Sequence, residues 1–382
     1  MGRPSTLTLR KDLGRTLRQG HPWVFRDALL DPPPLAHGEL VAVADKQGRE
    51  FAFGYWDAKS TIAVRVLDLA PIGDKRAIVH RRLGVALALR RARIDLRNTD
   101  TFRWVHGEAD RLPGIHLDVY RDVATVRFDG EGSRAFYGDL KALLLECAPE
   151  LHLRKLVDRE TRGEGADEVE VRENGIRFLV DLGRGQKGGL FLDQRENRKA
   201  IGERAQGKSV LNLFGYTGGF SLYAARAEAR RTDTVDIAHP AIAAARRNFE
   251  HNVFPLDRAG FHATDVFVFL TKAIAEKRTW DIVISDPPSF APSKNSLVMA
   301  RRSYLQLHRM AAQVVAPGGL FCAASCSSHL DRREFLTLVK TGVHQAGRRF
   351  TLETYTGAGL DHPTLPVFPE GDYLKFALGH VQ

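Results

Sequence analysis

The strongest constraint on the fold is a regular alternation of strand-like and helix-like segments that begins after Gly188. Short apolar runs of strand length are separated by segments whose apolar residues recur at helical spacing. The strand-like runs are SVLNLF, TDTVDI, DIVISD and LFCAAS, and the helical segments span residues 222–230, 242–252 and 304–315. Strands alternating with helices at these spacings predict a doubly wound, mostly parallel α/β sheet. We therefore expect a Rossmann-like domain over residues 186–382.

Two smaller domains are predicted ahead of it. Residues 1–73 carry short β-like runs separated by turn residues, ELVAVAD, GREFAFGYWD and STIAVRVLD, which predict a small β-rich module. Residues 74–185 begin with a helix rich in Lys and Arg after Lys75. The strand-like runs GIHLDVYRD, VATVRFD, KLVDRE and GIRFLVDL follow, with one helical run around 136–147, so we expect an α+β middle domain. The basic face of the first helix suits RNA contact and simple solvation equally well.

Composition narrows the partner and the compartment. Among 382 residues, 56 Lys and Arg against 46 Asp and Glu give a net charge of +10, which favours an anionic partner such as RNA over a generally solvated basic surface. The three cysteines form no even disulfide set, so we expect a reducing cytoplasm. No Cys/His cluster has zinc-ligand spacing, so we expect no metal. No apolar run approaches the roughly 18 residues that a membrane span needs.

A cofactor site is predicted where the first strand of the Rossmann-like domain ends. The run SVLNLF leads into GYTGG, which opens a helix but lacks the G-x-G-x-x-G spacing of a dinucleotide site. S-adenosylmethionine (SAM) has no pyrophosphate, so a different glycine turn suits it. We expect Asp236, at the end of the second strand, to bind the ribose and Asp265, after the third, to contact the adenine, although either acid could be only a helix cap. The contacts expected from the turn itself are Asn212, Phe214, Tyr216 and Gly218.

The predicted reacting groups are a carboxylate and a thiol at two further strand ends. In DIVISDPPSF the prolines hold the chain extended, so Asp286 faces the cleft and cannot enter a helix. Cys326 follows the strand LFCAAS. A thiolate that adds to C6 of cytosine makes C5 nucleophilic, and nearby His329 or an electropositive cleft could help the thiol to ionise. Cys326 could instead be a small apolar filler, which is the role expected of Cys322 and Cys147.

With these residues in view, the sequence resembles the SAM-dependent ribosomal RNA large subunit methyltransferase I family over almost its whole length. GHPWVF resembles that family's N-terminal PUA domain, and GEADRLPGIHLDVY its middle domain. GGLFLDQRENR, LNLFGYTGGF, DPPSFAPSK, SCSSH and FPEGDYLK resemble its catalytic motifs. The resemblance implies 5-methylcytosine formation in 23S rRNA, with Cys326 as nucleophile and Asp286 as base-binding acid. It also places Phe191, Gln194 and Arg198 beside SAM.

Alternatives stay open at this point. Many RNA 5-methylcytosine enzymes carry a second cysteine where Ser289 stands, so a 5-methyluridine enzyme is an alternative. Methylation of a base nitrogen is another, although an aromatic residue directly after Asp-Pro-Pro would be expected for it. A non-catalytic RNA-binding assembly factor is the third, and the sequence is compatible with a homodimer. Because a base inside a helix cannot reach such a cleft, we expect base flipping or a single-stranded target.

Overall fold

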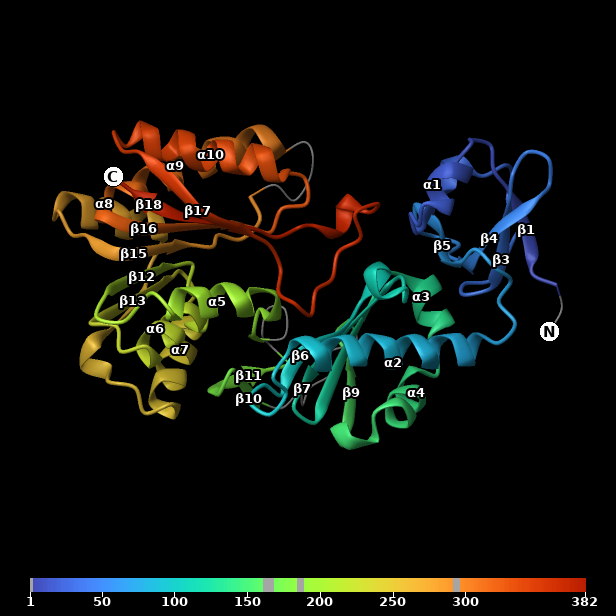
Figure 1. The fold of residues 1–382 in the computed structure, drawn as a ribbon, viewed down its shortest axis with the longest axis horizontal. Helices are drawn as coiled ribbons and strands as arrows, with labels where there is room; N and C mark the ends of the chain where they lie inside the picture. Colours follow the sequence, from blue (N-terminus) through green and yellow to red (C-terminus); the bar gives the residue numbers. More distant parts are fainter. Residues whose placement is uncertain (1–2, 161–167, 184–188, 291–295) are drawn as a thin grey trace. The chain divides into compact units, whose positions relative to one another are not determined.

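The computed structural model describes residues 3–160, 168–183, 189–290 and 296–382 (Figure 1). The chain divides into two compact units. Unit 1 comprises Met1–Ala166 and Leu360–Gly371, and unit 2 comprises Asp167–Gly359 and Asp372–Gln382. The domain boundaries predicted after residues 73 and 185 stay a prediction. Residues 291–294 of the DPPSFAPSK motif and the first glycine of GGLFLDQRENR lie outside the described residues.

Unit 1 begins with a five-stranded sheet in the order β1-β3-β4-β5-β2. The three β-like runs predicted for the first module form β3, β4 and β5, which confirms that part of the prediction. The elements are β1 (Ser5–Thr8), α1 (Gly14–Arg18), β2 (Trp23–Phe25), β3 (Leu40–Ala44), β4 (Glu50–Trp56) and β5 (Ile62–Asp68). Alternate apolar side chains of these strands, among them Val24, Val43 and Val64, form the core of this module.

The rest of unit 1 is a four-stranded sheet in the order β6-β7-β8-β9 with three helices. Its elements are α2 (Lys75–Arg93), β6 (Thr101–His106), β7 (Ile115–Tyr120), β8 (Val123–Phe128), α3 (Glu131–Phe136), α4 (Leu140–Cys147) and β9 (Lys155–Asp158). Helix α2 begins after Asp74 because that carboxylate accepts hydrogen bonds from two backbone amides of the first turn. The single helical run expected around 136–147 is two helices, with Gly138 in the turn between them.

The basic helix α2 is present as predicted, but its arginines are not confined to a solvated face. Arg82 and Arg90 are buried, and Arg90 donates to both carboxylate oxygens of Asp110 at 2.5 and 2.7 Å. Arg76, which is exposed, is paired with Glu146 on α4. Much of the positive charge of α2 is therefore neutralised within unit 1, so the positive face of this helix carries less unpaired charge than its sequence indicates.

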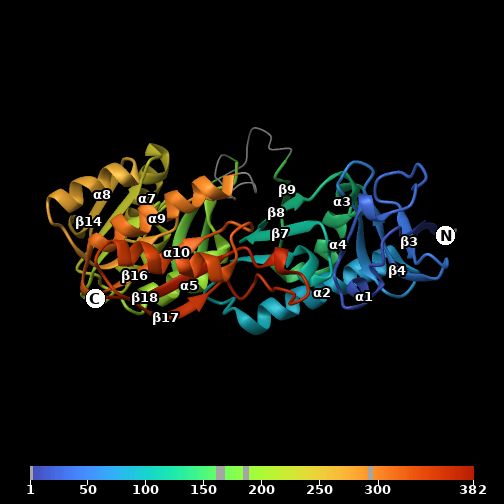
Figure 2. The same cartoon turned by 90° about the horizontal axis from the view of Figure 1, so that it is seen from above.

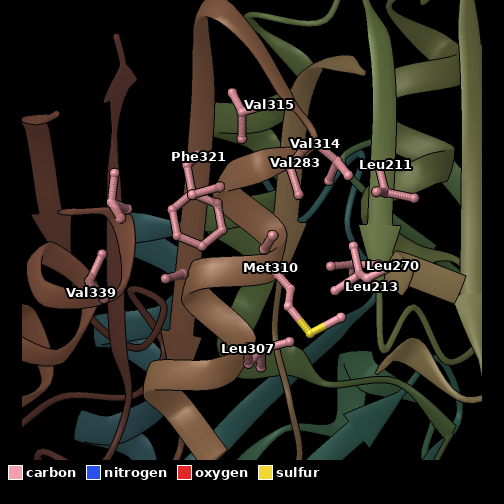
Figure 3. Packing of buried hydrophobic residues seen from close by; sticks show 14 of the residues in the cluster. Leu211, Leu213, Leu270, Val283, Leu307, Met310, Val314, Val315, Phe321 and Val339 are labelled. Atoms are coloured by element: carbon pink, nitrogen blue, oxygen red, sulfur yellow. The ribbon is translucent and has the colours of Figure 1, made fainter. Parts of the chain in front are cut away.

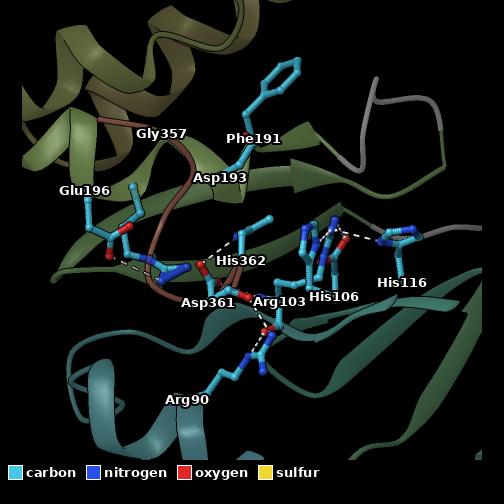
Figure 4. Close-up of polar contacts among 12 residues, drawn as sticks. Arg90, Arg103, His106, His116, Phe191, Asp193, Glu196, Gly357, Asp361 and His362 are labelled. Carbon is cyan, nitrogen blue, oxygen red and sulfur yellow. Dashed lines mark hydrogen bonds and ion pairs between the residues drawn. The ribbon is translucent and has the colours of Figure 1, made fainter. Parts of the chain in front are cut away.

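The segment Leu360–Gly371 is tied to unit 1 by a polar network around Asp361 (Figure 4). The backbone carbonyl of Asp361 accepts from Arg90 at 2.7 Å, and its carboxylate accepts from the amide of Arg103 at 2.8 Å. The same carboxylate contacts Nδ1 of His362 at 2.9 Å, and the His362 ring lies 5.0 Å from that of His106. Asp361 and His362 are both buried, so this segment is fixed to unit 1 by satisfied polar contacts.

Unit 2 contains a seven-stranded sheet in the order β14-β13-β12-β15-β16-β18-β17. The first five strands in this order are parallel, and β18 is antiparallel to both β16 and β17. The strands are β12 (Ser209–Leu213), β13 (Arg231–Asp236), β14 (Ala259–Ala263), β15 (Trp280–Ser285), β16 (Val315–Ser325), β17 (Phe350–Thr356) and β18 (Lys375–Val381). The prediction of a doubly wound, mostly parallel sheet is confirmed.

Helices cover both faces of this sheet, with α5, α6 and α7 on one side and α8, α9 and α10 on the other (Figures 1 and 2). Their bounds are α5 (Arg195–Gly202), α6 (Gly219–Arg226), α7 (His239–His251), α8 (Val266–Ala275), α9 (Leu297–Gln313) and α10 (Arg332–Gln345). All three predicted helices differ in extent, and α7 begins three residues earlier than expected. Helix α6 ends four residues earlier than expected, since Glu228 adopts a φ of +58°, and α9 begins seven residues earlier.

The core between the sheet and α8, α9 and α10 is built from aliphatic and aromatic side chains (Figure 3). Leu211 and Leu213 of β12, Val283 of β15 and Phe321 of β16 face Leu307 and other residues of the helices. Strands buried on both faces need near-continuous apolar sequence, which explains runs such as DIVIS and LFCAA. This rigid layer fixes the strand ends at which the candidate site lies.

A two-stranded hairpin, β10 (Glu168–Glu173) and β11 (Ile176–Asp181), packs against α7 of unit 2. The side-chain oxygen of Asn248 accepts from the amide of Leu179, and that of Asn252 accepts from the amide of Arg177, both at 2.9 Å. The structure thus groups this hairpin with unit 2, although the strand-like run GIRFLVDL was expected in the middle domain.

Within the described part of the chain, none of the helices combines the length and apolar character needed to cross a bilayer. None of its clusters of His, Cys, Asp and Glu side chains has an arrangement that could hold a metal ion.

Candidate active site

The predicted site residues come together at one edge of the seven-stranded sheet. Strands β12, β13, β14, β15 and β16 are parallel, so their carboxyl ends meet at the same edge. Phe214 follows β12, Asp236 ends β13, and Asp265 follows β14. Asp286 follows β15 and Cys326 follows β16. This edge is where open α/β sheets bind their ligands.

The turn after β12 has an unusual backbone. Phe214 and Tyr216 adopt φ values of +57° and +48°, a left-handed conformation that is rare for residues with a Cβ, and Gly218 has a φ of +83°. Gly215 must be glycine because a Cβ there would lie 2.5 Å from Cγ2 of Thr234. Such strain, roughly 1 to 3 kcal/mol for each non-glycine residue, concentrates at ligand-binding sites.

Asp236 and Asp265 differ in the use of their carboxylates. Asp236 Oδ2 accepts from the amide of Tyr216 at 3.0 Å and Oδ1 from the amide of Ala238 at 2.9 Å, so each oxygen keeps a second lone pair for another donor. Asp265 Oδ1 caps α8 by accepting from the amides of Phe267 and Val268. Asp265 therefore does act as the helix cap that the sequence allowed. The side chains of Asp236 and Asp265 are both half-buried.

The segment 191–198 contacts two of the other predicted residues. The ring of Phe191 lies edge-on to that of Tyr216, with centroids 5.4 Å apart. Gln194 Nε2 donates to Asp286 Oδ2 at 2.9 Å, and Gln194 Oε1 accepts from Asn197 Nδ2 at 2.6 Å. Gln194 and Asn197 are buried, so this chain of hydrogen bonds fixes the direction of the Asp286 carboxylate.

Two of the predicted contact residues, Arg198 and Asn212, are bound to other side chains of unit 2. Arg198 is buried and donates to both oxygens of the buried Glu173, at 2.8 and 2.7 Å, and to the carbonyl of Phe191. Asn212 is also buried, and its Nδ2 donates to Oγ of Ser221 at 3.1 Å. Both side chains hold the walls of the site together, whether or not they also touch a ligand.

Asp286 and Cys326 lie at the ends of adjacent strands, where Ser285 of β15 pairs with Ala323 of β16. Both side chains are half-buried. The phenol of Tyr304, on α9, hydrogen-bonds to Oγ of Ser325 at 2.8 Å. Burial raises the pKa of Tyr304 to about 12, and repulsion from Cys326 and Asp286 adds to this rise. The Cys326 thiol and the Asp286 carboxylate therefore both lie close enough to Tyr304 of α9 to affect its pKa.

The other cysteines and His329 have different surroundings. Cys322 is fully buried within β16, and burial raises the pKa of its thiol, as expected for an apolar filler. Cys147 is half-buried at the end of α4 in unit 1, and burial also raises its pKa. His329 is exposed. On α9, Arg301 is paired with Glu334 of α10.

Sequence reasoning missed two polar residues at this edge, Tyr304 and Lys375. Lys375 is the first residue of β18, lies opposite Ser325 in the sheet and is 1% exposed. It belongs to the FPEGDYLK motif, whose resemblance to a catalytic motif was the available signal. Tyr304 was recognised only as a helical position.

Comparison with known proteins decides the family. The family described as S-adenosylmethionine-dependent methyltransferase matches residues 157–341, and the PUA-like domain family matches residues 7–69. Proteins called ribosomal RNA large subunit methyltransferase I are similar over nearly the whole chain. The protein from Shewanella amazonensis is 35% identical over 98% of this chain and 99% of its own, and that from Photobacterium profundum is 34% identical over 97% and 98%. The chain belongs to the ribosomal RNA large subunit methyltransferase I family.

Solved structures agree on the fold. A protein from Streptococcus mutans described as a SAM-dependent methyltransferase is 22% identical and covers 98% of this chain and 100% of its own, with a TM-score of 0.85. A methyltransferase structure complexed with SAH covers the same shares with a TM-score of 0.86. The predicted fold class, a SAM-methyltransferase sheet preceded by a PUA-like domain, is thereby confirmed.

SAM is the cofactor of this family member, and the residues at the sheet edge fit it. Asp236 retains lone pairs for two ribose hydroxyls. Phe191 and Tyr216 offer half-buried aromatic surface, and the turn that includes Gly218 allows close approach of a ligand to the backbone. Neither pyrophosphate-binding glycine spacing nor a basic phosphate clamp is needed, which agrees with the prediction of SAM rather than NAD.

Proposed function

We propose that this methyltransferase forms 5-methylcytosine in 23S rRNA through a covalent adduct of Cys326. The observation that carries the proposal is the placement of Cys326 and Asp286 at neighbouring strand ends beside the glycine turn. The names of the curated relatives support a large-subunit rRNA substrate, and the net charge of +10 and the PUA-like module support RNA as the partner.

Carbon 5 of cytosine is a poor nucleophile, and the thiol solves this problem. The Cys326 thiolate donates an electron pair to C6, and the C5–C6 π electrons become available at C5 as an enamine. SAM supplies an electrophilic methyl group to that carbon. A base then removes the C5 proton, the C5–C6 double bond re-forms, and the C6–S bond breaks with its electrons returning to Cys326. The thiolate is thus regenerated, and the base that takes the C5 proton is Asp286 or water.

Asp286 is proposed to hold the pyrimidine while this happens. A carboxylate accepts a hydrogen bond from the N4 amino group, and a carboxylic acid donates to N3, so the residue can bind the ring edge and stabilise the adduct. The hydrogen bond from Gln194 restricts Asp286 to one orientation before the base arrives. The target base is proposed to be flipped or single-stranded, since a stacked base cannot reach a half-buried thiol.

The proposed cofactor contacts follow the sheet edge. Asp236 binds the ribose hydroxyls and Asp265 contacts the adenine edge. The remaining proposed contacts are Phe191, Gln194, Arg198, Asn212, Phe214, Tyr216, Gly218 and Asp286. The strained backbone at Phe214 and Tyr216 supports the glycine turn as a binding element. A homodimer and a cytoplasmic location remain predictions from the sequence.

One observation favours a second candidate, 5-methyluridine. Ser289 is exposed and stands where many RNA 5-methylcytosine enzymes carry a second cysteine that assists product release. Enzymes that make 5-methyluridine also pair Asp-Pro-Pro with one later cysteine. Uracil offers a carbonyl at C4 in place of the amine, so Asp286 would have to be protonated to donate to it.

The decisive variant is Cys326→Ala, with Cys322→Ala as its matched control because Cys322 lies in β16, the strand that Cys326 follows, but is fully buried. We expect Cys326→Ala to abolish methyl transfer from radiolabelled SAM to rRNA while SAM binding, measured by calorimetry, persists. Cys322→Ala should retain transfer. Transfer by Cys326→Ala would contradict the covalent proposal and favour nitrogen methylation. Loss of transfer in both variants, with SAM binding intact, would also count against a specific role for Cys326.

A further inference from the structure

Lys375 lies beside the proposed nucleophile in the sheet. In the antiparallel pairing of β16 with β18, Lys375 is opposite Ser325, the residue directly before Cys326. Its ammonium group donates to the carbonyl oxygen of Ser327, the residue directly after Cys326, and to that of Tyr373 at 2.8 Å. The backbone of Lys375 therefore pairs with the residue before Cys326, and its side chain binds the residue after Cys326.

A buried ammonium needs a compensating negative charge. Lys375 is 1% exposed, and transfer of such a charge from water is costly unless it is paired. In the described part of the chain, no carboxylate lies within ion-pair distance of its ammonium, and the two hydrogen-bond acceptors that it contacts are neutral carbonyls. Burial accordingly lowers the pKa of Lys375 to about 8, so the group still carries its charge at neutral pH.

The charged groups around Lys375 narrow the choice of counter-ion. Asp372 and Asp331 attract it from a distance, Arg332 repels it, and a thiolate at Cys326 would attract it. Asp286 and the phenol of Tyr304 are the other titratable groups near Cys326, and the Asp286 carboxylate opposes a negative charge on the sulfur. Arg332 itself faces Asp372, with Nη1 3.5 Å from Oδ1, so that carboxylate is shared with another cation. The sheet register and the hydrogen bond to the Ser327 carbonyl place the Lys375 side chain beside the backbone segment that carries Cys326.

We propose that Lys375 is a positioning residue that holds Cys326 as a thiolate before the base arrives. This rests on the proposed function, in which Cys326 is the nucleophile. The thiol proton passes to solvent, no atom changes oxidation state, and the resulting sulfur anion becomes the counter-ion of the buried ammonium. The two backbone carbonyls hold the ammonium in place, so that the same charge can also favour return of the electron pair to sulfur when the C6–S bond breaks.

The test measures ionisation of the thiol without RNA or SAM. The rate at which iodoacetamide alkylates Cys326 is followed against pH by mass spectrometry of the peptide that contains it. In the unmodified protein we expect a midpoint at least one pH unit below the value near 8.5 of an ordinary thiol, whereas half-buried Cys147 of the same protein should show none of this lowering. A Cys326 midpoint at or above 8.5 overturns the proposal, whatever any variant does.

Two substitutions of Lys375 test whether its positive charge lowers the alkylation midpoint of Cys326. Lys375→Met should raise the Cys326 midpoint by at least one pH unit, which is a tenfold loss of thiolate at pH values below both midpoints. Lys375→Arg keeps a cation and should retain most of the effect. At saturating SAM and RNA, kcat of Lys375→Met at pH 7 should fall about tenfold and recover toward pH 9. An unchanged midpoint in a folded Lys375→Met protein that still binds SAM overturns the proposal.

Failure of this inference is distinguishable from failure of the proposed function. If Cys326→Ala retains methyl transfer while the Lys375→Met shift is observed, the thiolate is real but is not the nucleophile. If Cys326→Ala is inactive and the midpoint is ordinary, the covalent chemistry stands and Lys375 is only a structural link between β16 and the start of β18.

Discussion

The buried pair of Glu173 and Arg198 yields a quantitative prediction, since both side chains are inaccessible to solvent and their contact is bidentate. Arg198→Met removes the guanidinium and leaves the Glu173 carboxylate in the core. Breaking a buried ion pair on one side costs about 3 to 5 kcal/mol because a charge is left uncompensated. Arg195, whose Nε lies 3.8 Å from Glu173, offsets part of that cost. We therefore expect a loss of about 3 kcal/mol.

The assay is urea unfolding of the full chain, followed by circular dichroism. Adding Glu173→Gln to Arg198→Met removes the buried charge and should recover at least half of the loss. The matched control is Arg246→Met, which breaks an exposed pair with Glu250 and should change the free energy of unfolding by less than about 0.5 kcal/mol.

The refuting result is a loss below about 1 kcal/mol for Arg198→Met, or a double variant that is less stable than the single one. Calorimetry on the folded variant then separates the two roles of Arg198. A SAM affinity within about threefold of the original indicates that the arginine only holds the wall of the site. A loss of tenfold or more, about 1.4 kcal/mol, indicates the direct contact that we propose.

Three further predictions concern single side chains. Gln194→Leu should lower kcat by roughly tenfold to a hundredfold in steady-state assays because Asp286 loses a charge-assisted hydrogen bond of about 1.5 to 3 kcal/mol, and an unchanged kcat would remove Gln194 from the proposed network. Tyr304→Phe should cost about 1 kcal/mol of unfolding free energy through loss of the hydrogen bond to Ser325, and a neutral effect would contradict this. Burial lowers the pKa of His308 to about 3, below its unfolded value near 6.5, so its stabilising contribution is complete above pH 6.5 and is lost as pH falls toward 3. His308→Leu should flatten the acid side of the stability profile by up to about 1.4 kcal/mol per pH unit, and an identical slope would refute the assignment.

The parallel sheet could be predicted from the sequence because each strand is indicated by the residues of its own short segment. Runs such as DIVISD and LFCAAS have the length and apolar content that buried parallel strands require, and Asp286 and Cys326 follow them directly. The strand ends of a parallel sheet then meet by topology alone, so the cluster at one edge follows without knowledge of distant contacts.

The parts that escaped prediction depend on contacts between distant residues. Nothing near Lys375 indicates that it will lie opposite Ser325, because antiparallel register across 50 residues is decided by tertiary packing. The hydrogen bond from Gln194 to Asp286 joins residues 92 apart, and nothing in either local segment indicates the ion pair between Arg198 and Glu173.

The basic helix illustrates the same limit. Its charge pattern predicted a positive outer face, but the structure buries Arg82 and Arg90 against backbone carbonyls and carboxylates of unit 1. An arginine can bury its aliphatic stem and satisfy its guanidinium internally, so charge along a sequence does not reveal which side of a helix is solvated.

The most direct test of the account is to trap the adduct on RNA. A large-subunit rRNA fragment in which cytidine is replaced by 5-fluorocytidine carries fluorine at C5 in place of the proton, so the last step cannot release the enzyme. With SAM present, we predict a covalent protein–RNA complex that resists denaturation and whose crosslinked peptide contains Cys326. Complete methyl transfer to RNA that contains ordinary cytidine, with no covalent complex on the fluorinated RNA, would contradict the account.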